Sequence, residues 1–321
     1  MRAGQQGRQR HPGRRAGAVM EHWEPHLQAL HRLFYESAGD RCLLWVNPAQ
    51  GDPFAGNALV EECKVRVPIA HPRFDLKFAP YLVPLALHRH ADADVFKSSV
   101  QMAWDAWSVE SLQAANGQAI AGWVIADAEP ASLARHWASN CHLHVDKQLH
   151  KLLRFHDPGV REWLWRALSP AQQQQLLGPA RTLIGFDRNR QLMFHDRGAA
   201  QVESGATGKL ALSPLLWEQI DDYATVHAAW LNALPVLDGG RSLREREVFQ
   251  ALKQATQYGI HDPQDREVFA GHALRIGPDF HRDERLLAVW ALTRGGNFYG
   301  GALEEVTGQA VDCLPHYLAP V

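Results

Sequence analysis

The chain has 321 residues, of which 33 are basic and 35 acidic, and its formal net charge is −2. This near-neutral balance gives no overall electrostatic reason to bind nucleic acid or an anionic membrane surface. A chain of this length buries roughly three quarters of its extended surface on folding, so it needs no disulfide or metal crosslink. The length suits two lobes.

The four cysteines, Cys42, Cys63, Cys141 and Cys313, lie far apart and form no CxxC pair. This spacing argues against a zinc ribbon or a redox pair and favours reduced, buried thiols in a cytoplasmic protein. No run of about 18 apolar residues is present, so we expect no membrane span.

Residues 1–19 contain five arginines, no acidic residue and no apolar stretch. A signal peptide requires an apolar core, so this segment is not expected to be one. We expect either a disordered basic tail or a true start at Met20. A nucleic-acid-binding arm is the alternative interpretation.

The first half of the chain alternates between helical and strand patterns. Apolar residues at helical spacing predict helices, and short apolar runs bounded by turn residues predict strands. The predicted helices cover residues 22–36, 94–107 and 130–140, and the predicted strands cover residues 42–46, 79–87, 120–127 and 149–155. This alternation predicts an α/β (α+β) lobe with a mixed sheet over residues 20–203.

After Pro179 the pattern predicts a β-hairpin. Two apolar stretches, 182–186 and 191–195, flank the polar turn 187–190. The small residues of 204–208 then predict a linker.

The remainder, 209–321, is predicted to form a smaller all-helical lobe. Its helix starts are Ser213-Pro214, a capping box of Ser242 with Glu245, Asp262-Pro263, and Asp283 ahead of a helix to Arg294.

Residues 152–179 raise the question of a catalytic site because Arg154, His156 and Asp157 lie together. A structural interpretation accounts for them. Asp157 is expected to cap a helix that starts at Pro158, and Arg154 to pair with Asp157 or reach nearby carbonyl groups.

The same stretch continues with a second helix start of the same kind. Ser169 and Gln172 form a capping box around Pro170, and Gly178 supplies a left-handed residue at the end, ahead of Pro179. No residue in this stretch needs a catalytic role to explain it.

A metal site is the main chemical alternative. On a strand, His142, His144 and Asp146 would share one face, as zinc ligands can. No HExxH motif accompanies them, so a solvated edge strand is the preferred interpretation and we expect no metal. The glycine-containing loop 51–58 resembles a phosphate loop but lacks the lysine and hydroxyl side chains that contact phosphate and magnesium, and we expect a surface loop.

These residues resemble the signature of the type VI secretion effector chaperone/adaptor family, long known only as a domain of unknown function. The resemblance rests on one block, residues 152–186, with weaker similarity over most of 23–280. The matching residues are Arg154, Phe155, Asp157, Pro158, Leu168, Pro170, Gln172, Gly178 and Pro179. His156 departs from the aromatic residue that is usual at its position.

The resemblance implies a cytoplasmic bacterial adaptor that binds a toxic effector and loads it onto the VgrG spike. It implies no catalytic residues. Apart from the resemblance, we expect no cofactor and no nucleic-acid partner.

For such an adaptor, we expect the cleft between the lobes to hold the effector. Partner binding is assigned to two apolar helix faces: Leu216, Ile220 and Tyr223, and Leu286, Val289 and Trp290. The alternative interpretation is that both faces are packed in the core. An α/β enzyme with a His-based metal site is the alternative function.

Overall fold

The computed structural model describes residues 23–37, 39–71, 74–144, 150–197, 210–233 and 245–319. It contains the expected α+β half and helical half. Six strands form one sheet in the order β2-β3-β1-β4-β7-β8. These strands are β1 (Arg41–Val46), β2 (Val65–Arg66), β3 (Tyr81–Leu85), β4 (Ile120–Ala126), β7 (Ala180–Phe186) and β8 (Leu192–Asp196). A separate pair consists of β5 (His142–His144) and β6 (His150–Leu152).

The sheet is antiparallel at every described pair of neighbouring strands, which corrects the expectation of a mixed sheet. Helix α3 (His90–Asp105) joins β3 to β4, and these two strands run in the same direction. Strand β1 lies between them and runs opposite to both. The insertion of β1 therefore converts a parallel pair into two antiparallel pairs.

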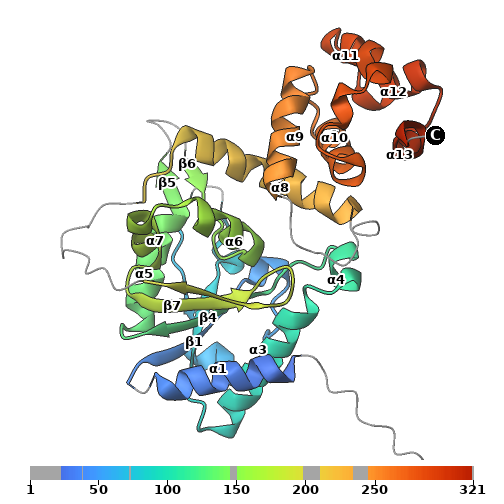
Figure 1. The fold of residues 1–321 in the computed structure, drawn as a ribbon. Coiled ribbons are helices and arrows are strands. Elements are labelled where there is room, and N and C mark those ends of the chain that lie inside the picture. Colours follow the sequence, from blue (N-terminus) through green and yellow to red (C-terminus); the bar gives the residue numbers. More distant parts are fainter. Residues whose placement is uncertain are drawn as a thin grey trace, which may run out of the picture.

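Helices cover both faces of the sheet. In the first half they are α1 (Glu24–Glu36), α2 (Ala58–Cys63), α3, α4 (Val109–Gln113), α5 (Pro130–Cys141), α6 (Pro158–Ala167) and α7 (Pro170–Leu177). Alternate residues of a strand point to opposite faces. Leu43 and Trp45 of β1 therefore enter the core beneath α5, α6 and α7, whereas Leu44 and Val46 enter the core that contains α1 and α3. Figure 1 shows the sheet between these two helical layers.

The second half is helical throughout its described residues, as expected. Its helices are α8 (Pro214–Ala233), α9 (Glu245–Gln257), α10 (Pro263–Ile276), α11 (Leu287–Arg294), α12 (Tyr299–Thr307) and α13 (Leu314–Leu318). Ser213 and Asp262 accept the hydrogen bonds of helix caps at the predicted starts of α8 and α10. The helix expected at 283–294 begins with a 3-10 turn, Glu284–Leu286.

Helix α8 belongs to the cores of both halves. Leu216 and Trp217 near its start pack into the core under α6. Val226, Ala229 and Ala233 pack with α9 and α10 in a third core. Figure 1 shows α8 at the junction, with α9 to α13 beyond it.

Some predicted features fall outside the described residues, namely the tail 1–19, the linker 204–208 and Ser242 of the capping box. The boundaries at 203 and 209 stay predictions. No helix in the described part of the chain is both long and apolar enough to cross a membrane.

Candidate functional site

The signature block begins with a sharp corner between β6 and α6. Asp157 caps α6 as predicted, since its Oδ1 accepts the main-chain N–H groups of Gly159 at 2.9 Å and Val160 at 3.3 Å. Pro158 occupies the first helical position, where its missing N–H leaves no bond unmade. Phe155 is fully buried against the rings of Trp45 and Trp137. The corner is therefore a packed structural element.

Arg154 does not have the role predicted for it. Its side chain is exposed and has no hydrogen bond or ion pair with any described residue. Only its main-chain carbonyl takes part in the corner, accepting the N–H of Asp157 at 3.0 Å. The strand ends before Arg154, so the side chain is directed to solvent instead of to the carboxylate of Asp157.

The arginine inside the corner is Arg161, which the sequence interpretation missed. It is 1% exposed, and Nη2 donates to the carbonyl of Ala121 in β4 at 2.6 Å. Nη1 donates to the carbonyl of Phe155 at 3.4 Å, and the guanidinium lies 5.7 Å from the centre of the Trp45 ring. Burial lowers the pKa of Arg161 to about 10, so it is cationic at neutral pH. Arg161 thus joins α6 to the centre of the sheet.

One strand glycine makes room for this guanidinium, and a second allows two strands to approach closely beside it. A Cβ at Gly185 in β7 would lie 2.6 Å from Nη2 of Arg161. Gly122 in β4 has a φ of 142°, and a Cβ there would collide with the carbonyl oxygen of Ile184. Glycine inside a strand often marks such a close approach, and this is the signal by which the sequence could have revealed a buried group under β4 and β7.

The second half of the signature block also has structural roles. Ser169 and Gln172 form the predicted capping box of α7. Gly178 ends α7 with a positive φ of 59°, but its ψ of −122° lies outside the left-handed helical region that was expected. Pro179 follows at the entry to β7. The predicted hairpin of β7 and β8 is present, and Asp187 Oδ1 closes its turn by accepting the N–H groups of Asn189 and Gln191.

A second buried arginine lies at that turn. Arg188 is 1% exposed, and its guanidinium lies 4.8 Å from the Trp230 ring, 5.6 Å from Tyr223 and 5.8 Å from Trp107. It donates to the hydroxyl of Tyr223 and, at 3.0 Å, to Nδ1 of His227. Tyr223, His227 and Trp230 all belong to α8. A side chain of the sheet half therefore binds the helix that carries the other half.

Glu162 supplies negative charge beside this junction. It is 6% exposed, and its carboxylate pairs with Arg166. Burial raises the pKa of Glu162, while Arg166 and Arg188 lower it. The arrangement balances charge in the interior, as buried ionic groups require.

The six residues assigned to partner binding lie inside the fold. Leu216 and Tyr223 are buried, and Ile220 is half-buried against the same core. Leu286, Val289 and Trp290 are 0 to 2% exposed in the core of the helical half. Their contact with a partner stays a prediction. In the described conformation these residues pack within the cores of the two halves.

An open groove lies on the neighbouring face of α8. It has a volume of about 610 Å³ and is bounded by α8, α9 and the start of α10. Leu215 at its edge is 64% exposed. Phe249 on its floor also packs on Trp163 of α6, with ring centres 5.2 Å apart. Asp222 and Arg266 form a two-pronged ion pair within it, at 2.8 and 2.9 Å. The groove thus combines an exposed apolar edge with paired charges.

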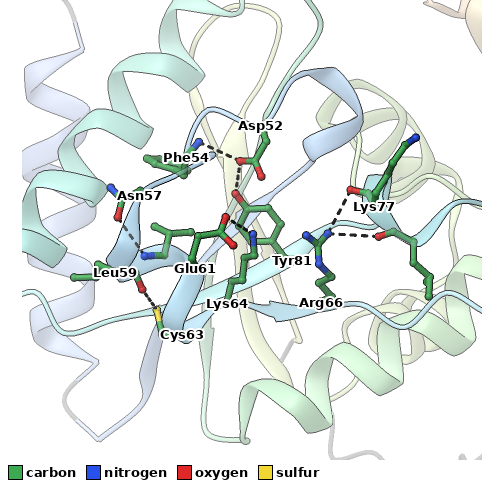
Figure 2. Close-up of polar contacts among 12 residues, drawn as sticks. Asp52, Phe54, Asn57, Leu59, Glu61, Cys63, Lys64, Arg66, Lys77 and Tyr81 are labelled. Atoms are coloured by element: carbon green, nitrogen blue, oxygen red, sulfur yellow. Dashed lines mark hydrogen bonds and ion pairs between the residues drawn. The ribbon is translucent and has the colours of Figure 1, made fainter.

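The loop 51–58 uses its polar groups internally, as Figure 2 shows. Asp52 accepts the hydroxyl of Tyr81 at 2.6 Å and the N–H of Phe54 at 3.1 Å. Asn57 caps α2 by accepting the N–H of Val60. The loop contains an aspartate and no lysine, so it does not supply the positive charge of a phosphate loop.

Two of the thiols, those of Cys42 and Cys63, are poor nucleophiles. Cys42 and Cys63 line a hollow at the end of the sheet. Burial raises the pKa of both, and Asp92 raises that of Cys63 further. A thiol that stays protonated at neutral pH reacts slowly.

Metal ligands are not gathered in the described structure. Within the described residues, no group of three or more His, Cys, Asp or Glu side chains could hold a metal ion. The side chains of His142, His144 and Asp146 lie outside this description. The His-based alternative is therefore untested.

These features define an α+β protein with a helical extension, whose signature residues stabilise the junctions between its elements. A model of a domain of unknown function (DUF4123) matches residues 75–175, which is nearly a third of the chain. The matched range runs from the turn before β3 to the last turn of α7 and includes the corner. No curated protein and no solved structure matches the chain.

The corner geometry predicts that Asp157 and Arg154 differ in their effect on stability. Asp157→Ala removes an N-cap and should lower the free energy of unfolding by roughly 0.5–2 kcal/mol. Arg154→Ala removes an exposed side chain and should change it by less than about 0.5 kcal/mol. Urea unfolding of both variants measures this. Equal destabilisation by Asp157→Ala and Arg154→Ala would contradict the roles given to Asp157 as a helix cap and to Arg154 as an exposed side chain.

A second prediction concerns pH. His195 is buried on β8, stacked on Trp165 with ring centres 4.7 Å apart, and neither ring nitrogen has a hydrogen-bond partner among the described residues. Burial, and then Arg161, lower the pKa of His195 to about 3. A histidine in the unfolded chain has a pKa near 6.5. His195 therefore contributes stability that is fully present above pH 6.5 and is lost as the pH falls toward 3.

His195→Phe keeps the ring stack but removes the titration. Between pH 4 and 6 the variant should lose about 1.4 kcal/mol less stability per pH unit than the unsubstituted chain. Urea unfolding at several pH values tests this. An unchanged slope would mean that His195 is protonated in the folded state.

Proposed function

We propose that the chain is a non-enzymatic adaptor that binds a toxic type VI secretion effector in the bacterial cytoplasm and loads it onto the VgrG spike. The observation that carries the proposal is the overlap between the signature block, which resembles that adaptor family, and the family-model match over 75–175. The structural roles of Asp157, Phe155 and the capping box support it further, because they account for the signature without catalysis.

The proposal assigns the effector to the groove between α8, α9 and α10. An adaptor must hold an apolar effector segment that would otherwise aggregate, and an exposed apolar edge beside a cavity suits that purpose. Leu215 and Phe249 provide the apolar contacts, and Glu218 and Lys253 border them with opposite charges. The faces of α8 and α11 that were predicted to bind a partner are buried. We therefore assign the effector contact to the adjacent, open face of α8.

The function is tested by co-expressing the full chain with the toxin and the spike protein encoded beside it. We expect the three proteins to elute together in size-exclusion chromatography, and the toxin to leave the spike fraction when the chain is omitted. Toxin and spike that co-elute equally well without the chain would contradict the adaptor role.

The groove assignment predicts a difference between two equally exposed leucines. Leu215→Asp places a charge at the groove edge and should weaken toxin binding at least tenfold, since one desolvated charge costs more than 1.4 kcal/mol. Leu287→Asp on α11 is the matched control, because Leu287 is also 64% exposed but does not line the groove. Calorimetric titration with the toxin measures both. Equal binding by both variants, with unchanged melting temperatures, would place the toxin elsewhere.

The proposal includes no metal and no cofactor. Elemental analysis of the purified chain should therefore find far less than one zinc per chain. A stoichiometric zinc that disappears in the His142→Ala/His144→Ala double variant would favour the metalloenzyme alternative instead.

A further inference from the structure

The contact between Arg188 and α8 differs from the other contacts between the two halves. Arg188 is fully buried and cationic, whereas the ion pair of Lys151 with Asp221 is partly exposed, with Asp221 at 57%. Exposed ion pairs contribute little because water screens them. A buried charge that loses its partners is far more costly, because nothing replaces its lost hydration.

The partners of Arg188 occupy one stripe of α8. Tyr223, His227 and Trp230 are spaced by four and three residues, so they share a face of the helix. The guanidinium has donors only, so Nδ1 of His227 must accept and His227 must be neutral at that atom. Burial, followed by Arg188, accordingly lowers the pKa of His227 to about 4.

An adjacent stripe of the same turns packs against the remaining helices. Val226, Ala229 and Ala233 are 0% exposed and pack in the core formed with α9 and α10. Arg188 therefore contacts α8 at the same turns that pack against α9 and α10. The apolar contacts of Leu216 and Trp217 lie about two turns before Tyr223 in the helix.

We propose that Arg188 is a latch that couples the helical half to the sheet half. While its guanidinium is bound to Tyr223, His227 and the surrounding rings, the end of α8 and the helices beyond it move and unfold together with the sheet. When the latch is removed, these helices open on their own while the sheet remains closed. This coupling goes beyond the proposed function and does not depend on it.

Hydrogen exchange of the full-length chain, followed by mass spectrometry, tests the latch. In Arg188→Met, amides of residues 226–233 and 245–319 should exchange at least tenfold faster, which is about 1.4 kcal/mol of local stability. Amides of β1, β4 and β7 should exchange at their original rates. Tyr223→Phe, which removes only one hydroxyl partner, should produce a smaller effect in the same segments.

Arg161→Met is the matched control, because Arg161 is equally buried but its hydrogen-bond partners among the described residues lie within the sheet half. It should accelerate exchange in β4 and α6 and leave residues 245–319 unchanged. The latch is overturned if Arg188→Met and Arg161→Met accelerate the same segments, or if Arg188→Met leaves the helical half unchanged. If Arg188→Met fails to fold, hydrogen exchange of Tyr223→Phe tests the latch instead. Faster exchange confined to residues 226–233 and 245–319 supports the latch, and unchanged exchange in these residues overturns it.

Discussion

Two guanidinium groups buried beside helix α6 constrain much of this structure. A guanidinium stays charged and has five N–H donors, so its surroundings must provide acceptors and ring faces. Arg161 finds them in main-chain carbonyl groups and in Trp45, and it requires the glycine at 185. Arg188 finds them in Tyr223, His227 and three aromatic rings. One arginine fixes α6 to the sheet, and the other fixes α8 to the hairpin.

This constraint gives the signature block a physical meaning. Asp157 and Pro158 set the start of α6, and the start of α6 determines where Arg161 enters the sheet. The hairpin that follows α7 delivers Arg188 to the junction. The residues that carry the family resemblance therefore specify how the fold is assembled. Under the proposed adaptor function, we expect specificity for a particular toxin to reside in surface residues outside this block, of which Leu215 is our leading candidate.

The features predicted correctly from the sequence are local. The caps at Asp157, Ser169 and Asp262 depend on residues within three positions of each other, and the hairpin depends on a turn of four residues. The features that the sequence did not reveal depend on distant contacts. Both Arg154 and Arg161 follow apolar residues, and only the carbonyl of Ala121, forty residues away, makes Arg161 the buried one.

The same reason explains the two larger differences. The direction of the strands depends on where β1 inserts, which no local pattern encodes. The apolar faces of α8 and α11 are covered by other elements of the fold, so a sequence pattern alone cannot distinguish them from an exposed binding surface. The open groove has the opposite character, because its apolar edge at Leu215 adjoins polar residues and follows no helical stripe.

The proposed adaptor role is tested most directly by secretion in a bacterium that encodes this chain together with a toxin and a VgrG spike protein. After deletion of its gene, the account predicts that the toxin encoded beside it disappears from the secreted fraction while the VgrG spike is still secreted, and that the reintroduced chain restores the toxin. Toxin secretion that is unchanged by the deletion, with the spike secreted normally, would contradict the account.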